Sequence, residues 1–312
     1  MAISARMKTC RLLAIYLAAV VLFSALAAPW LFRLCQAGMN HAGWPDWLRG
    51  ITFADVLNRL LLLSAIAGGV WLLASQKALS LRTVGLDPSP NALPHLLLGL
   101  VVSISSVLLV WILGLAVGAR EWDTRNGVAR IWSVTCINLV EAVLIGVSEE
   151  FFFRGCLLGW LRQRVPGMFA LVVVTVFYAL SHFLNPPRYA RFVDKLDWLS
   201  GFRMLGQYGA RLMEDGRWIP ECLMLLLIGL TLGWCFLRTG RLYLSIGLHA
   251  GWVFAGKMLT FLTDANEEAY NWWFGPGRIS GSPITIIVLA VVFLVMVWIC
   301  KKPAMRGGGK AS

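Results

Sequence analysis

Residues 131–161 have the sequence IWSVTCINLVEAVLIGVSEEFFFRGCLLGWL. The apolar run over 131–153 is long enough to cross a membrane as one helix, since a span needs about 20 such residues. No proline follows before Pro166, so we expect the helix to continue to about residue 161. The run also contains a charged motif, SEEFFFR, between apolar residues. The stretch therefore predicts a membrane helix with a polar site built into it.

The composition of the whole chain indicates a protein that faces lipid. Hydrophobic residues make up 58% of the 312 residues and charged residues only 14%, whereas a soluble domain carries about 25% charged residues. Further apolar segments lie at 12–32, 57–75, 94–118, 168–185, 220–237, 242–263 and 282–300. Backbone polar groups in lipid must be satisfied within the segment, which favours helices. The predicted fold class is therefore all-α, a polytopic transmembrane helix bundle of about eight spans.

The first apolar run resembles a secretory signal peptide in its start. Basic residues precede it, and Ala25-Leu26-Ala27 is similar to a cleavage site. The run continues for about 20 residues, however, which is longer than the usual apolar core of such a signal. We therefore expect 12–32 to be an uncleaved first span.

Charged residues in the loops predict the orientation of the spans. If the N-terminus is cytoplasmic, the inner segments contain one acidic residue, Asp87, and many basic residues. The basic residues are Arg6, Lys8, Arg11, Lys77, Arg82, Arg162, Arg164, Arg238, Arg241, Lys301, Lys302, Arg306 and Lys310. Most acidic residues fall in the outer segments. This is the positive-inside bias, so both termini are predicted to be cytoplasmic (N-in/C-in).

The net charge of +12 is expected to bring these inner loops into contact with anionic lipid. No nucleic-acid partner is expected, because the sequence has no basic face and no recognition motif. The cysteines are scattered and form no C-x-x-C pair. We expect free thiols, and neither a disulfide framework nor a zinc site built from them.

Few ionisable side chains lie inside the predicted spans, and each is a functional candidate because a charge in lipid is costly. They are Glu141, Glu149, Glu150, Arg154, His182, His249 and Lys257. Glu150 and Arg154 are four residues apart and are expected to pair on one helix face. Glu149 points about 100° away from that face, where it is suited to act as a general base.

Counting the helical rise from the inner helix ends predicts similar depths for three of these side chains. At about 1.5 Å per residue, Glu149 lies roughly 18 Å, His182 roughly 21 Å and His249 roughly 10 Å along its helix. We therefore expect the three to converge inside the bundle.

Structural interpretations fit the same residues. Glu150 and Arg154 can form an ion pair that serves only stability, and a membrane histidine often makes only an interhelical hydrogen bond. For Glu141 and Lys257, pairing with each other or with the backbone is favoured over catalysis.

Three motifs resemble those of the CAAX-protease and bacteriocin-processing family of intramembrane proteases, also called the Abi family. Its E-E-x-x-x-R motif is present from Glu149 to Arg154, and its F-x-x-x-H motif is similar to Tyr178–His182, with tyrosine in place of phenylalanine. Its third motif is a histidine followed four residues later by asparagine. His249 matches that histidine, and Val253 stands at the asparagine position. The resemblance covers about residues 130–260.

The resemblance implies a mechanism and the roles of these residues. Glu149, with His182, would activate a water that attacks a peptide carbonyl, and His249 would donate to the developing oxyanion. Valine cannot supply the second donor, so either Tyr178, Asn185 or a backbone group replaces it, or activity is low or absent. The family implies no cofactor. Zinc is an alternative by residue type, and it is disfavoured because Glu150 is expected to pair with Arg154.

The sequence and the resemblance together predict a division of the chain and a function. Residues 1–125 form N-terminal helices without a family motif, 126–265 the catalytic helical core, and 266–312 the last span and a basic tail. The predicted function is intramembrane hydrolysis of a peptide bond in a membrane-associated or lipidated protein. A non-catalytic immunity or scaffold protein of the same family is the alternative, and a proton-coupled transporter is a third hypothesis. The family resemblance favours a bacterial inner membrane.

Overall fold

The computed structural model describes residues 2–39, 50–77, 79–183, 193, 195–208, 218–266, 272–274 and 281–301. The chain forms two compact units. The first combines Met1–Lys77 with Leu180–Trp218, and the second combines Ala78–Ala179 with Ile219–Ser312. Each unit is described by itself below.

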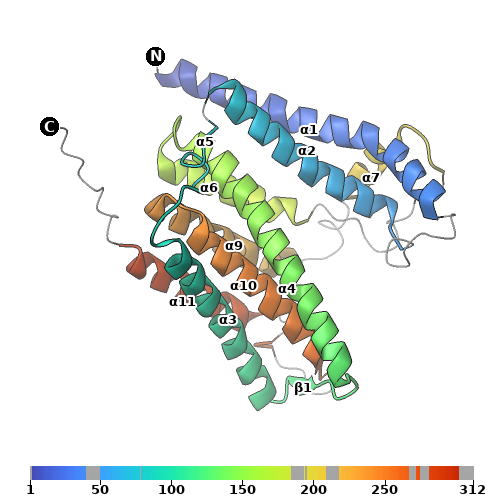
Figure 1. The fold of residues 1–312 in the computed structure, drawn as a ribbon, viewed down its shortest axis with the longest axis vertical. Helices are drawn as coiled ribbons and strands as arrows, with labels where there is room; N and C mark the ends of the chain where they lie inside the picture. The colour runs from blue at the N-terminus through green and yellow to red at the C-terminus, as the bar shows by residue number, and fades with distance from the viewer. Residues whose placement is uncertain are drawn as a thin grey trace. The chain divides into compact units, whose positions relative to one another are not determined.

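The first unit is built from α1, α2 and α7, with bounds Ala2–Met39, Phe53–Ser75 and Ser200–Tyr208. Figure 1 labels these helices, with α1 and α2 in blue tones. The three helices share a core that includes Ala28, Phe53, Leu57, Met204 and Tyr208. At the start of α2, Thr52 and Asp55 form a capping box, which satisfies backbone donors that the first helical turn leaves unpaired.

The second unit holds most of the helices. In chain order they are α3 (Ala92–Ala116), α4 (Val128–Glu150), η2 (Phe151–Leu158), α5 (Gly159–Leu161), α6 (Gly167–Ser181), α9 (Trp218–Thr239), α10 (Tyr243–Leu262) and α11 (Pro283–Ile299). A short antiparallel ribbon pairs β1 (Arg120–Trp122) with β2 (Thr263–Ala265). The described part of the chain is thus all-α apart from this ribbon, as the sequence predicted.

Within the described residues, every segment predicted to span the membrane overlaps a helix. Five helical segments are long and apolar enough to cross a bilayer: Arg11–Gly38, Phe53–Ser75, Ala92–Ala116, Val128–Leu161 and Trp218–Thr239. Two shorter apolar helices are Gly167–Ser181 and Pro283–Ile299. The continuation of the fourth segment to residue 161 and the break before Gly167 are confirmed. The chain is an integral membrane protein.

Helix α10 differs from the other predicted spans. It forms over the expected range and has 20 residues, but it is not among the segments that are apolar enough to cross a bilayer within the described residues. All nine residues from Leu244 to Trp252 are buried, so both polar and small residues of this stretch are enclosed by protein. Figure 1 shows α10 between α3 and α4. Enclosure by other helices explains why α10 tolerates a less apolar sequence than a lipid-facing helix.

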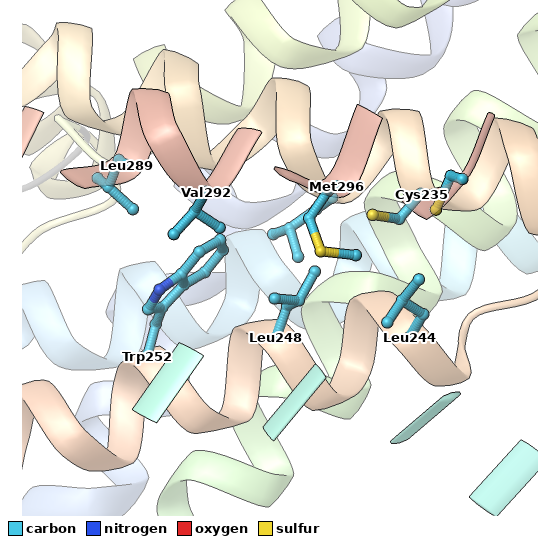
Figure 2. Close-up of a cluster of buried hydrophobic side chains, with 9 residues drawn as sticks. Cys235, Leu244, Leu248, Trp252, Leu289, Val292 and Met296 are labelled. Carbon is cyan, nitrogen blue, oxygen red and sulfur yellow. The ribbon is translucent and has the colours of Figure 1, made fainter. Parts of the chain in front are cut away.

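One face of α10 packs on α11 and α9. Leu244, Leu248 and Trp252, spaced four residues apart, contact a buried cluster that includes Val292 and Met296 of α11. Figure 2 shows these side chains in two facing rows. The Trp252 indole also donates to Ser106 Oγ of α3 at 3.0 Å, which satisfies its buried polar atom.

Small residues bring α10 into backbone contact with α3 and α4. A Cβ on Gly247 would lie 2.1 Å from the Leu96 carbonyl oxygen, and a Cβ on Gly99 would lie 2.5 Å from the Leu244 oxygen. Close helix approach through small residues is a common device in membrane proteins, because dispersion contacts then replace the missing hydrophobic drive. On α4, Gly146 packs against Ala250 in the same way.

We predict that Gly247→Ala destabilises the second unit. The added methyl group must move α3 away from α10, and overpacking of this kind costs roughly 1–3 kcal/mol. Gly256→Ala is the matched control in the same helix, because nothing lies within 4 Å of its added Cβ; helix propensity predicts a gain of about 1 kcal/mol there. Denaturation in detergent micelles measures both, and equal stability of the two variants would contradict the packing argument.

Candidate functional site

The site begins where α4 changes its geometry. Glu150 is the last residue of α4, and Phe151–Leu158 form a π-helix. A π-helix bonds i to i+5 and is rare, and its short examples are frequent at functional sites. Phe152 to Leu158 are all buried. Gly155 allows this segment to lie against the chain before α3, since a Cβ there would be 3.0 Å from the Val84 carbonyl oxygen.

Glu150 is the centre of a buried ionic cluster. Its Oε1 accepts from Arg154 Nη1 at 2.7 Å and lies 2.8 Å from His249 Nδ1. Glu150 is fully buried, and Arg154 and His249 are 1% and 4% exposed. The ion pair with Arg154 holds Glu150 as a carboxylate, which can only accept hydrogen bonds. His249 Nδ1 must therefore carry the proton and donate it.

The other nitrogen of His249 faces the neighbouring glutamate. Nε2 lies 3.8 Å from Glu149 Oε2, which is a close approach and too long for a hydrogen bond. The Glu149 side chain is 21% exposed, so it is the more accessible of the two carboxylates. One imidazole thus lies between two carboxylates, with its tautomer fixed by Glu150 and its Nε2 directed toward Glu149.

Aromatic rings surround the guanidinium of Arg154. Its Cζ lies 4.5 Å from the Tyr178 ring centroid and 5.7 Å from that of Phe153, both within cation–π range. Tyr178 also packs edge-on to His249, with ring centroids 6.2 Å apart. Arg154 Nη2 donates to the Gly229 carbonyl oxygen of α9 at 3.4 Å. The cluster therefore joins α4, the π-helix, α6, α9 and α10.

The remaining predicted site residues have different outcomes. His182 follows α6, is partly buried and belongs to the first unit, whereas the glutamates and His249 belong to the second. Its approach to Glu149 stays a prediction. Asn185 lies outside the described residues. Val253 lies one turn after His249 on α10 and is partly buried.

The predicted pairing of Glu141 with Lys257 is confirmed. Lys257 Nζ donates to Glu141 Oε2 and links α10 to α4. Nearby, Asn138 Nδ2 lies 3.4 Å from the sulfur of Met258 across the same two helices.

The donor set gives limited scope for a metal ion. Oε1 of Glu150 is already used by Arg154 and His249. Within the described ranges, no three His, Cys, Asp or Glu side chains are grouped so that they could hold a metal. The metal-free interpretation therefore stays the prediction.

Two features of the site escaped the sequence analysis. The first is the π-helix after Glu150, for which the sequence carries no recognised signal. The second is the glycine face of α10, which a G-x-x-x-G spacing at Gly247 and Gly251 could have indicated. Gly99 and Ser103 supply the complementary small residues on α3, and a Cβ on Gly251 would lie 1.9 Å from Ser103 Oγ.

The fold and the cluster define an integral membrane protein of helices that encloses a glutamate–arginine–histidine site. Residues 131–255 match the family model of Type II CAAX prenyl endopeptidase Rce1-like proteins. Over this segment the chain is similar to that CAAX-protease family, in agreement with its motifs. The match contains Glu149, Glu150, Arg154 and His249. Searches of curated proteins and of solved structures found no match.

We predict that Arg154→Met strongly destabilises the protein. It would leave the buried Glu150 carboxylate without its cation, and breaking a buried pair on one side costs roughly 3–5 kcal/mol. The control is Arg125→Met, which removes an exposed arginine bonded to Asp123 and Asp264 near the ribbon; exposed pairs contribute little. Denaturation in micelles compares the two, and a small loss for Arg154→Met would show that Glu150 is not held as a charge.

Proposed function

We propose that this chain is an intramembrane endopeptidase that hydrolyses a peptide bond in a membrane-associated or lipidated protein. At the level of the family it is a membrane peptidase. The observation that carries the finer proposal is the position of His249 between Glu150 and Glu149, within the matched segment. The substrate class follows from the family description, since CAAX sequences carry a prenylated cysteine near the C-terminus.

In the proposed reaction Glu149 is the general base. It takes a proton from a water, with His182 as the predicted second contact of that water, and the resulting hydroxide attacks the peptide carbonyl. The tetrahedral intermediate then collapses, and Glu149 returns the proton to the leaving amine nitrogen. The products are a carboxylic acid and a free amine. A positioned base of this kind contributes typically 10²–10⁴-fold to the rate.

Glu150 and Arg154 act in this proposal as positioning residues. Because Glu150 accepts from His249 Nδ1, the ring cannot rotate, and Nε2 stays directed toward the reacting centre. A proton on Nε2 would then stabilise the oxyanion of the intermediate. One such donor is worth about 3 kcal/mol.

Val253 supports the alternative of a non-catalytic family member. It lies where the family motif has a second oxyanion donor, and its side chain cannot donate. We propose that the enzyme retains activity through another donor, with Tyr178 and Asn185 as candidates, and that its rate is lower than with asparagine. No cofactor is required in this mechanism.

We predict that Glu149→Gln and His249→Ala abolish cleavage of lipid-anchored peptides, and that His182→Ala lowers it by about 10² or more. Each variant must be as stable as the wild type when it is denatured in detergent micelles. Elemental analysis of the same preparations tests the metal-free mechanism, because zinc bound in stoichiometric amount and lost in His182→Ala would overturn it. Equal cleavage by wild type and Glu149→Gln would contradict the catalytic assignment.

Val253→Asn is predicted to raise kcat. An asparagine one helical turn from His249 supplies the amide donor that the motif normally provides, with a gain of up to about 10²-fold. Val253→Leu is the control for shape, because it supplies no donor. Single-turnover cleavage measures the chemical step, and an asparagine variant no faster than the leucine variant would show that another group already fills this role.

The number of spans, their orientation and the type of membrane are also proposals. We propose eight spans with both termini cytoplasmic and anionic lipid at the basic inner loops, as the loop charges suggest. The family resemblance supports a bacterial inner membrane. The ranges 1–125, 126–265 and 266–312 remain the proposed division of the chain. Labelling of single cysteines placed after residue 301 with a membrane-impermeant thiol reagent tests the side of the C-terminus.

A further inference from the structure

A second ionic group lies on α4 and α10 that the proposed mechanism does not use. Glu141 and Lys257 pair across the two helices, with side chains 48% and 39% exposed. This exposure contrasts with the buried Glu150 cluster. Ionisable groups in membrane helices are costly, and they often mark a path for substrate or ions. The pair needs an explanation beyond the link between two helices, since Gly146 and Ala250 already pack those helices together.

The pair and the catalytic site share one side of the same helix pair. Glu141 precedes Glu149 by eight residues, and Lys257 follows His249 by eight residues. Residues i and i+8 fall on the same helix face. Eight residues correspond to about 12 Å along a helix axis. Both helices therefore give the same separation between the Glu149–His249 contact and the Glu141–Lys257 pair.

The residues between the two ionic groups are aliphatic. Ile145 lies four residues from both Glu141 and Glu149, and Val253 lies four residues from both His249 and Lys257. Both are partly buried, so each keeps some exposed surface. These side chains form an apolar strip on α4 and α10. The strip lies between the Glu149 carboxylate at one end and the Lys257 ammonium group at the other.

This spacing fits a short apolar peptide with a free C-terminus. An extended chain covers about 3.3–3.6 Å per residue, so 12 Å corresponds to about three or four residues. A CAAX sequence has three residues after its prenylated cysteine. A peptide whose reacting carbonyl lies at Glu149 would bring its terminal carboxylate close to Lys257.

We propose that Lys257 binds the C-terminal carboxylate of the substrate. An ammonium group has three donors, so Lys257 can bond the substrate carboxylate while Glu141 keeps it in position. Ile145 and Val253 would contact the apolar side chains of the residues to be released. The inference rests on the proposed function and adds to it the residue that recognises the free carboxyl terminus of the substrate.

The test compares two forms of one farnesyl-cysteine peptide with three apolar residues after the cysteine, as the free acid and as the C-terminal amide. For the wild-type full chain we expect a KM for the acid about tenfold below that for the amide, the usual value of a bond to a charged group. In Lys257→Met this preference is lost, and in Lys257→Arg it is partly kept. Lys301→Met, which removes a charge in the exposed segment after α11, should keep the full preference.

Binding separates this proposal from the proposed function. Acid and amide affinities are also measured by fluorescence on Glu149→Gln, alone and combined with Lys257→Met. If Glu149→Gln binds the acid more tightly than the amide and the double variant does not, the proposed role of Lys257 is supported. This holds even if the wild type cleaves neither peptide, and that absence of cleavage would refute the proposed protease function. Equal affinity for acid and amide would overturn the proposed role of Lys257 in binding the carboxylate. An equal loss of affinity for both peptides in Lys257→Met would also overturn it and leave Lys257 as a link between helices.

Discussion

The structure depends on keeping one carboxylate charged inside a membrane protein. Glu150 is fully buried, and an isolated carboxylate in such a place would cost several kcal/mol. Arg154 and His249 both bond the same oxygen, Oε1, and the Arg154 guanidinium is covered in turn by Tyr178. His249, Tyr178 and the Gly229 carbonyl group come from distant parts of the chain, so α4, α6, α9 and α10 must pack in one arrangement around the pair. The cluster thereby fixes the helices that carry the reactive groups.

The buried Glu150 cluster also depends on the small residues of α10. His249 can reach Glu150 only if α10 lies close to α4, and Gly146 against Ala250 permits that approach. On the opposite side, Gly247 and Gly251 let α3 lie directly on the α10 backbone. The enclosed stretch Leu244–Trp252 does not need an apolar surface for lipid, which is why α10 can carry His249 there. Its low hydropathy and its central position have the same cause.

The sequence predicts the local features of this protein better than the distant ones. Runs of about 20 apolar residues mark the helices because lipid imposes that length, and the bond between Glu150 and Arg154 follows from i, i+4 spacing. The bond between Glu150 and His249 joins residues 99 apart, and no periodicity encodes which nitrogen faces which carboxylate. The π-helix was also not predictable, since it depends on how Phe151–Leu158 packs rather than on a residue pattern. Helical depth predicts that Glu149 and His249 converge, and the family motifs imply that His249 is an oxyanion donor, but neither predicts its bond to Glu150.

The valine at position 253 removes one of the two side-chain donors expected at the proposed site. With asparagine there, the oxyanion would have two side-chain donors on one helix turn, and each could compensate for a small displacement of the other. With valine, the proposed mechanism would depend on His249 as its donor on α10, so the orientation of its ring would matter more. That orientation is set by Glu150, and the charge of Glu150 is set by Arg154. In the proposed mechanism the Glu150–Arg154 pair would therefore carry more of the catalytic geometry, while the same valine extends the apolar strip toward Lys257.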